Sequence, residues 1–279
     1  MSEKLSYPFN PSEYEKKEAN VSTEIPIKSG NTQAKISPEK GSLVTSFKVD
    51  GKDVLFVDNE SFADPRNVKY KMGIPILFPY AGPRGEAPQH GGAREVPWVW
   101  KDRTENSATV SLDFETLPDE MKEELKDKDL YGKDFNYYVE AKITVGEGLL
   151  GYDLSFKNKS KTPKPFAPGL HPYFAVDHKR IDEMKTNLNA DLLKRGPKSI
   201  IVDRPEGDVW FTLPDGRKVT ISSSPEFKKI VIWSEKQDSD YICIEPFVTD
   251  PKNKEEEIVL NPGEEKQLSV EFKVEQKGE

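Results

Sequence analysis

The sequence predicts an all-β protein that folds as a large antiparallel β-sandwich. From about Ser22 onward, apolar residues alternate with polar ones in short segments, and this period of two is typical of strands with one buried face. Turn residues separate these segments at short intervals. The 279-residue chain has no repeat of fixed period, no low-complexity linker and no break in composition, so we expect a single domain over residues 22–279. Residues 1–21 are charged and polar, and we expect a tail or an outer strap there.

Turn signals divide the predicted strands into hairpins. An Asp-Gly pair at positions 50–51 lies between two apolar segments, which is a strong hairpin signal, and a second Asp-Gly pair at 215–216 is placed in the same way. A Gly-Glu-Gly sequence at 146–148 separates two further alternating segments. The predicted strands cover residues 44–49, 54–56, 110–114, 139–145, 152–156, 211–213, 219–221, 230–233, 241–247 and 268–274.

One segment, residues 117–130, favours a helix. Pro118 suits the first turn of a helix, where its missing N–H has no partner to lose. The acidic residues Asp119 and Glu120 are well placed for the positive end of the helix dipole. We expect this helix to decorate the sandwich, which would then contain one or two short helices.

Composition and charge exclude several classes of protein. The chain carries 41 Lys and Arg against 49 Asp and Glu, a net charge of −8, and has no long basic block, so nucleic acid and anionic membranes are not expected partners. Its single cysteine, Cys243, rules out an internal disulfide framework and offers no metal-ligand spacing. No window is apolar and long enough for a signal peptide or a membrane span. We therefore expect a cytoplasmic protein.

The segment 73–100 has the composition of a binding loop. It begins as a buried apolar run and then sets His90 and Arg94 among glycines and prolines, ahead of Trp98 and Trp100. Gly and Pro turn the backbone where side chains converge. His, Arg and Trp supply a titratable group, a fixed fork of donors and flat apolar faces. The segment is therefore the first candidate for a ligand site.

Four motifs, in this order, resemble the signature of the aldose 1-epimerase (sugar mutarotase) superfamily. Gly-Ser-Leu-Val-Thr-Ser-Phe lies at 41–47, and Gly-Ile-Pro-Ile-Leu-Phe-Pro at 73–79 leads into Pro-Gln-His-Gly-Gly-Ala-Arg at 88–94 and a tryptophan. Gly-Leu-His-Pro-Tyr-Phe at 169–174 and Cys-Ile-Glu-Pro at 243–246 follow. The resemblance covers most of the chain. It implies the galactose mutarotase-like supersandwich, with a sugar site on a concave face.

Glu245 is a carboxylate in an otherwise apolar predicted strand, 241–247. Alternation places it on the face opposite Ile242 and Ile244. If the isoleucines face the core, Glu245 faces either bulk solvent or a lined pocket, and the pattern alone leaves both open. Pro246 cannot donate to a sheet ladder, so the strand is irregular beside the carboxylate, which favours a site.

Anomer exchange of a sugar fits one carboxylate and two motif histidines. A base takes the proton of the C1 hydroxyl, an acid protonates the ring oxygen, and closure of the open aldehyde reverses both transfers. Modest environmental shifts adapt Glu and His to these two roles, each worth typically ~10²–10⁴-fold in rate. The reaction needs no nucleophile, metal or cofactor, and we expect none.

The resemblance assigns roles to four residues. It makes Glu245 the base at the anomeric hydroxyl and His171 the acid at the ring oxygen. His90 is the second histidine, which holds the ring oxygen or an adjacent hydroxyl, and Arg94 is a donor to sugar hydroxyls. The third histidine, His178, lies in a charged run, where we expect a solvent-facing or hydrogen-bonded structural residue.

Two further residues are weaker candidates for sugar binding. Asp208 resembles the family's sugar-hydroxyl aspartate through a short match. Trp98 or Trp100 would stack on the apolar face of a sugar ring, whereas core packing is the expected role of at least one of them. The chain departs from the family at Gly92, where the motif commonly has an aromatic residue. Either the pocket lacks that wall, or Trp98 or Tyr80 supplies it.

The substrate and the competing functions stay open. We place a free hexose ahead of a hexose 6-phosphate, because an arginine that resembles a phosphate ligand in the phosphate branch is replaced by Lys71-Met72, and lysine lacks the bidentate fork. Arg66, Lys69 and Arg84 are nearby cations. A non-catalytic carbohydrate-binding module is the alternative class, followed by a lyase or a hydrolase, which usually needs a second carboxylate. The expected partner is a small sugar, and the protein is a monomer or a homodimer.

Overall fold

The computed structural model describes residues 24–64, 70–84, 87–117, 119, 122 and 134–276. Within this part of the chain, antiparallel strands form sheets of seven, six, four and two members, which confirms the all-β class. In chain order the strands are β1 (Ile25–Ser29), β2 (Thr32–Ser37), β3 (Leu43–Val49), β4 (Lys52–Asp53), β5 (Ile76–Leu77), β6 (Val99–Arg103), β7 (Ser107–Asp113), β8 (Tyr137–Gly146), β9 (Leu149–Asn158), β10 (Lys164–Phe166), β11 (Gly169–Leu170), β12 (Tyr173–Ala175), β13 (Ile200–Asp203), β14 (Val209–Thr212), β15 (Lys218–Ser223), β16 (Lys229–Trp233), β17 (Tyr241–Phe247), β18 (Ile258–Leu260) and β19 (Glu265–Glu275). The helical segments include α1 (Asn59–Ala63) and the short 3-10 turns η2 (Pro38–Lys40), η3 (Gln89–Gly91), η4 (Ala93–Glu95), η5 (Phe114–Thr116), η6 (His178–Glu183), η7 (Leu192–Lys194) and η8 (Lys254–Glu256).

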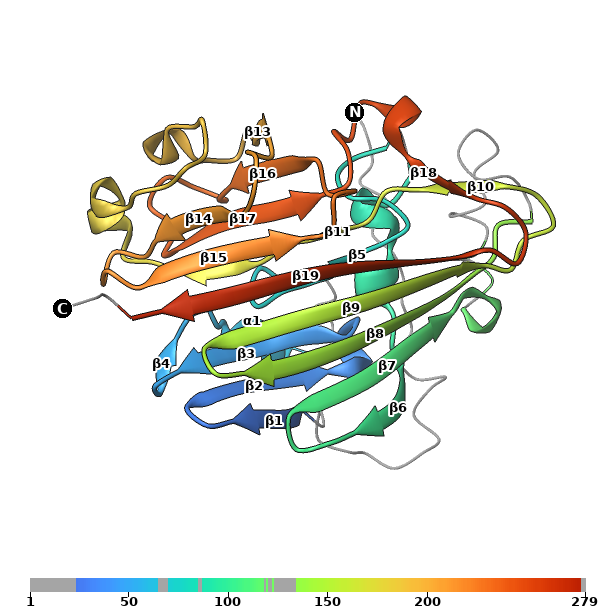
Figure 1. Cartoon of the computed structure of the whole chain (residues 1–279), viewed down its shortest axis with the longest axis horizontal. Coiled ribbons are helices and arrows are strands. Elements are labelled where there is room, and N and C mark those ends of the chain that lie inside the picture. The colour runs from blue at the N-terminus through green and yellow to red at the C-terminus, as the bar shows by residue number, and fades with distance from the viewer. Residues whose placement is uncertain are drawn as a thin grey trace.

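The seven-stranded sheet has the order β14, β15, β19, β9, β8, β7 and β6 and runs across the front of Figure 1. Its long strands alternate buried and exposed residues, which is the pattern that the sequence displays. The six-stranded sheet has the order β13, β16, β17, β11 and β5, with β12 also paired to β17. The four-stranded sheet, β1 to β4, is bridged to β12 through Leu55 and Phe174.

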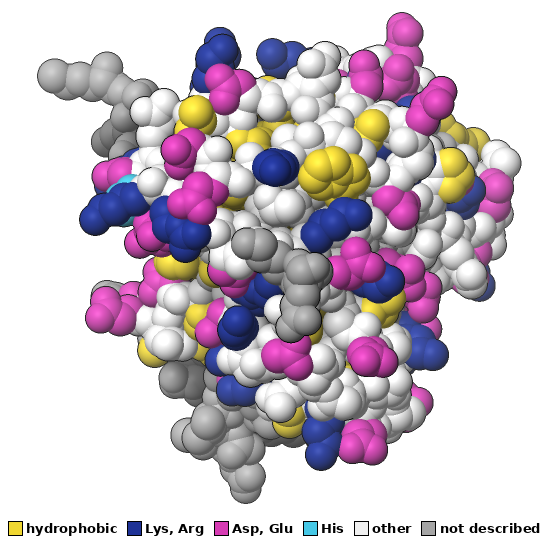
Figure 2. All heavy atoms as spheres, turned by 60° about the vertical axis from the view of Figure 1, so that its left-hand side comes forward, with side chains coloured by type: hydrophobic (Ala, Val, Ile, Leu, Met, Phe, Trp, Pro, Cys, Tyr) yellow, Lys and Arg dark blue, Asp and Glu magenta, His cyan; other side chains and the backbone are white. Residues whose placement is uncertain are grey.

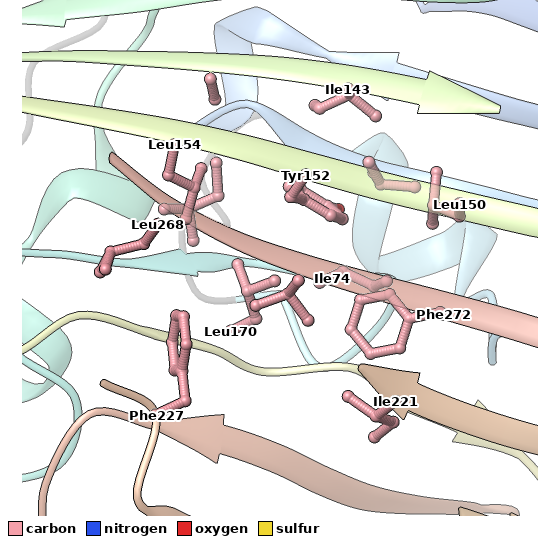
Figure 3. Close-up of a cluster of buried hydrophobic side chains, with 14 of the residues drawn as sticks. Ile74, Ile143, Leu150, Tyr152, Leu154, Leu170, Ile221, Phe227, Leu268 and Phe272 are labelled. Atoms are coloured by element: carbon pink, nitrogen blue, oxygen red, sulfur yellow. The ribbon is translucent and has the colours of Figure 1, made fainter. Parts of the chain in front are cut away.

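The hydrophobic core lies between the seven-stranded and six-stranded sheets. Leu154, Leu268 and Phe272 of the larger sheet belong to one buried cluster with Leu170 and Ile74 on the side of the smaller sheet (Figure 3). Two sheets that bury their apolar faces against each other form a β-sandwich. Strand β17 is buried along its whole length, so its second face is covered as well. That second face carries the site described below.

The predicted hairpins are present. β3 and β4 pair across the turn at Asp50 and Gly51, both of which have a positive φ, and β8 and β9 pair across the turn at 146–148. β14 and β15 form the third hairpin. The expected helix at 117–130 lies almost wholly outside the described residues, and the expected tail at 1–21 lies outside them completely.

The surface carries both signs of charge. On the face shown in Figure 2, acidic and basic side chains are interspersed. None of the helices in the described part of the chain is long and apolar enough to cross a membrane.

Candidate active site

Three short neighbouring strands bring the sequence motifs together. In the six-stranded sheet, β11 lies between β17 and β5. Gly169 of β11 is opposite Phe247 of β17 on one side and Leu77 of β5 on the other. A Cβ atom on Gly169 would lie 2.7 Å from the Phe247 ring, so only glycine allows the three strands to approach this closely. The segments that carry His90, His171 and Glu245 therefore start from adjacent strands.

Strand β17 shows the alternation that the sequence predicts. Ile242 and Ile244 belong to the main core between the sheets, whereas Cys243 belongs to a separate cluster with Tyr173 and Tyr241 on the other face. Glu245 shares this second face, and its residue is only 1% exposed. The question that the sequence leaves open is thereby answered, because the carboxylate faces a covered site rather than bulk solvent.

His171 and Glu245 lie in direct contact. Nε2 of His171 is 3.5 Å from Oε2 of Glu245. The imidazole stacks on the ring of Tyr173, with ring centroids 4.6 Å apart and planes 5° apart. The backbone N–H of His171 donates to the carbonyl of Pro75, 3.1 Å away, which ties the histidine to the segment ahead of β5. These contacts fix the orientation of the imidazole toward the carboxylate.

His90 lies beside His171, with ring centroids 5.5 Å apart and planes nearly perpendicular. Its Nδ1 accepts a hydrogen bond of 2.9 Å from the backbone N–H of Gly82, so the proton of the neutral ring is on Nε2. His90 also has a left-handed backbone with φ of 67°. This conformation costs a non-glycine residue conformational energy, and residues strained in this way concentrate at functional sites. We call His90, His171 and Glu245 the buried trio.

Arg94 adds a positive charge to the same site. The residue is 9% exposed and lies in η4, and its charge acts on both His171 and Glu245. Gly41, with φ of 69°, packs against the backbone of this turn, and a Cβ on Gly41 would lie 2.1 Å from the carbonyl oxygen of Arg94. The early motif that contains Gly41 therefore holds the loop that positions the guanidinium.

Burial controls the proton equilibria of the pair. Removal from water raises the pKa of Glu245 well above its ordinary value, and the positive charge of Arg94 partly opposes this shift. Burial also lowers the pKa of His171 to about 3, and Arg94 adds to the effect. The closed site thus favours a protonated carboxyl beside a neutral imidazole. That arrangement holds the same single proton as a carboxylate beside an imidazolium.

The other two sequence candidates lie elsewhere. Trp98 is 4% exposed within the main hydrophobic core, and its indole N–H donates to the carbonyl of Ala93, 2.9 Å away. Trp98 thus packs in the core and supports the Arg94 turn through this hydrogen bond, which is the core role expected of at least one of the two tryptophans. Asp208 is exposed ahead of β14, and no hydrogen bond or ion pair between described residues joins its carboxylate to the trio. Trp100 is 38% exposed on β6.

The structure adds an aromatic wall that the sequence analysis missed. Trp233 at the end of β16 is opposite Cys243 of β17, so its side chain shares the face of Glu245. Its ring is perpendicular to His171, with centroids 5.7 Å apart, and it lies close to Tyr173 and Tyr241. Tyr80, which the sequence offers as a replacement wall, is fully buried in the main core. The missing signal was the register of β16 against β17, which alternation within either strand does not reveal.

Two of the candidate phosphate ligands, Arg84 and Lys71, are already engaged. Arg84 is buried, forms an ion pair with Glu257 and lies over the ring of Tyr80. Lys71 is half exposed and pairs with Glu235. Arg66 and Lys69 lie outside the described residues. His178, as expected, is a hydrogen-bonded surface residue, with Nδ1 2.7 Å from Asp240.

Curated relatives resemble the chain, including the following two. A protein of Escherichia coli strain K12 is 29% identical over 140 residues, which are 49% of this chain and only 43% of that protein. A protein of Cenchrus ciliaris is 24% identical over 270 residues, which are 81% of this chain and 76% of that protein. Both carry the name "Putative glucose-6-phosphate 1-epimerase".

The fold and a family model give the wider assignment. The crystal structure of a galactose mutarotase-like protein from Lactobacillus casei ATCC 334 aligns with a TM-score of 0.72 at 18% identity, over 91% of this chain and 100% of that one. The chain therefore has the galactose mutarotase-like β-sandwich that the resemblance implies. The model of the aldose 1-epimerase family matches residues 24–209, which is more than half of the sequence. The chain belongs to the aldose 1-epimerase family.

Proposed function

We propose that the protein is an aldose 1-epimerase that interconverts the α and β anomers of a free hexose. The observation that carries this proposal is the contact between His171 and Glu245, whose side-chain atoms lie 3.5 Å apart in a buried site. Burial lowers the pKa of His171 and raises that of Glu245. His90 and Arg94 adjoin this pair and supply hydrogen-bond donors. The arrangement suits a reaction whose only covalent events are two proton transfers and the opening of a hemiacetal.

In the forward direction, the Glu245 carboxylate takes the proton from the C1 hydroxyl while His171 protonates the ring oxygen. The C1–O5 bond then breaks to give the open-chain aldehyde. Rotation about C1–C2 exposes the other face of the carbonyl. Closure reverses both transfers, with the Glu245 carboxyl as the acid and the neutral His171 as the base. The pair holds one proton in total at every stage, so burial shifts the balance between its two forms without removing the proton that catalysis uses.

The neutral form of the pair suits ring closure directly, because a protonated carboxyl faces a neutral imidazole. Ring opening needs the proton on His171 instead. The hydroxyl groups of a bound sugar hydrogen-bond the carboxylate and so replace part of the solvation that burial removes. His90, whose neutral ring donates through Nε2, would hold the ring oxygen or its neighbour.

A hexose 6-phosphate is the second candidate, because curated relatives are named for a 6-phosphate substrate. A free hexose ranks first because Arg84 is buried against Glu257 and Lys71 is paired with Glu235. A phosphate ligand would need cations that other carboxylates do not already neutralise.

The deciding experiment is magnetisation-transfer NMR on equilibrated glucose, galactose and glucose 6-phosphate, with and without the protein. We expect faster α–β exchange for a free hexose. Faster exchange for glucose 6-phosphate alone would reverse the ranking of the two substrates. If folded protein accelerates none of the three while still binding a sugar, the protein is a carbohydrate-binding module and the proposal fails. A metal chelator is expected to leave the exchange rate undiminished.

A further inference from the structure

A third side chain with strong metal-binding chemistry lies beside the catalytic pair. His171, Cys243 and Glu245 each offer one ligand atom, and these three atoms lie within 4.8 Å of one another. All three residues are buried. Cys243 is two positions before Glu245 on the same face of β17 and is opposite Tyr173 of β12. The linear sequence gave no such indication, because a single cysteine has no ligand spacing.

The donor set matches that of zinc. Imidazole, thiolate and carboxylate are the three protein ligand types that Zn²⁺ prefers, and three such ligands leave a fourth position open. Zn–N, Zn–O and Zn–S bonds of about 2.0–2.3 Å place tetrahedral donors roughly 3.3–3.7 Å apart. The 3.5 Å between Nε2 of His171 and Oε2 of Glu245 already fits this spacing. Cys243 needs a shift of about 1 Å at most to join them.

The charges of the site also fit a divalent ion. One thiolate and one carboxylate neutralise an M²⁺ ion, and a neutral complex avoids the cost of a buried net charge. Two protons leave to solvent when the ion binds, one from the Cys243 thiol and the single proton that His171 and Glu245 share. The neighbouring Arg94 guanidinium then faces a complex with no net charge.

We propose that His171, Cys243 and Glu245 form an inhibitory site for a thiophilic divalent cation such as Zn²⁺. The ion binds the same lone pairs of His171 and Glu245 that accept protons in the proposed mechanism. Bound metal therefore prevents turnover of the sugar. The inhibitory consequence rests on the proposed epimerase function, whereas binding of the ion does not. Ion binding inhibits the enzyme, whereas the proposed catalytic cycle uses no metal.

Binding is tested first, with Co²⁺ as a spectroscopic probe of the full-length wild-type protein. We expect a thiolate-to-cobalt charge-transfer band that one equivalent of Zn²⁺ abolishes. Because Cys243 is the single cysteine of the chain, the band reports on one residue. In the same samples, Zn²⁺ should slow alkylation of Cys243, a measurement that needs no variant. No charge-transfer band, or alkylation that is unaffected by Zn²⁺, would overturn the site.

Inhibition is tested next, by adding Zn²⁺ during anomer exchange and expressing each rate relative to the same enzyme in chelator. Cys243→Ser and Cys243→Ala should each raise the Zn²⁺ concentration for half inhibition by about 100-fold or more, since loss of a supporting partner alone costs 10–100-fold in affinity. The matched control is His178→Asn. It removes the imidazole from the surface cluster of Asp177, His178 and Asp240, whose ligand atoms also lie within 4.8 Å of one another, and should leave inhibition unchanged.

The outcomes separate the two proposals. Equal Zn²⁺ sensitivity of wild type and both Cys243 variants, or loss of sensitivity in His178→Asn, would overturn the inhibitory site. A protein that shows the cobalt band but no exchange activity in chelator would contradict the proposed function and leave the metal site intact. Excess sugar should raise the Zn²⁺ concentration needed for half inhibition, because both ligands use the same two side chains.

Discussion

Nε2 of His171 lies 3.5 Å from Oε2 of Glu245, and both residues are almost completely buried. Burial pushes the proton affinities of the two groups in opposite directions, so the pair behaves as one unit with one proton. This relationship, rather than either residue alone, sets the direction of the predictions below for Glu245 and His171. All activity measurements refer to the metal-free enzyme in chelator.

Glu245→Gln is expected to slow α–β exchange by roughly 10²–10⁴-fold, because the amide neither accepts nor returns the C1 hydroxyl proton. Magnetisation-transfer NMR measures the rate, and circular dichroism checks that the variant is folded. Glu147→Gln, in an exposed turn, is the control and should retain the wild-type rate. A Glu245→Gln rate equal to that of wild type would remove this carboxylate from the mechanism.

The pH profile of kcat/KM should lack the acid limb near pH 6.5 that an ordinary catalytic histidine gives. In the proposed mechanism the pair works with one proton, and burial lowers the pKa of His171, where a second proton would enter, to about 3. Activity should therefore hold as pH falls from 7 to 5. On the alkaline side, the limb reports loss of the single proton and should lie above the ordinary pKa of a carboxyl group.

His171→Asn tests this interpretation, since it should reduce the rate across the whole range and eliminate the alkaline limb of the pair. His178→Asn should leave the profile unchanged, because that histidine is part of a surface pair with Asp240. An acid limb between pH 6 and 7 in the wild type would show that His171 titrates as an unperturbed imidazole, contrary to its burial.

Glu245→Gln should also be more stable than the wild type at neutral pH. Since the folded state raises the pKa of Glu245, the unfolded chain ionises first, and stability falls as pH rises from about 4.5 toward the folded pKa. Glutamine removes this dependence, so the difference in unfolding free energy should widen by up to about 1.4 kcal/mol per pH unit. Urea denaturation between pH 5 and 8 measures it. A constant difference would contradict the shift.

Gly41→Ala should impair the Arg94 turn. The new Cβ would lie 2.1 Å from the Arg94 carbonyl oxygen, so the turn must move or the chain must strain. We expect a loss of roughly 1–3 kcal/mol in stability and a raised KM. Gly51→Ala is the matched control, since Gly51 has a similar φ of 72° with no atom within 4 Å of the added Cβ. If both variants lose the same stability, the loss comes from the positive φ alone and not from the contact with the Arg94 carbonyl oxygen.

Trp233→Ala should raise KM more than it lowers kcat, because the indole stands beside His171 but has no proton to transfer in the reaction. Trp233→Phe should recover part of the affinity. Trp100→Ala, on the exposed face of β6, is the control and should have no effect on KM. A larger effect from Trp100 than from Trp233 would place the sugar on the other side of the molecule.

Local pattern was sufficient to predict the long strands β7, β8, β9, β17 and β19, the three hairpin turns and the facing of Glu245, because each depends on neighbours within a few residues. It did not predict the first hairpin, β1 and β2, or the short strands β5, β11 and β12, and the strand expected at 54–56 is replaced by β4 at Lys52–Asp53. The sequence motifs also marked His90 and His171, which the structure brings together. Trp233 could not be found in this way, since its place follows from the register of β16 against β17. The metal-ligand geometry of Cys243 was hidden as well, because the histidine beside it comes from the segment between β11 and β12, about 70 positions earlier in the chain.

The two-residue strand β11 has a consequence for folding. His90, His171 and Glu245 come from widely separated parts of the sequence, and they meet only when β5, β11 and β17 have aligned. Contacts between residues so far apart in the sequence form late. Closing the large loops between them costs conformational entropy before the contacts themselves add any stability. Recovery of epimerase activity should therefore trail the recovery of strand signal during refolding. The time course of recovered activity would then report on the last stage of folding.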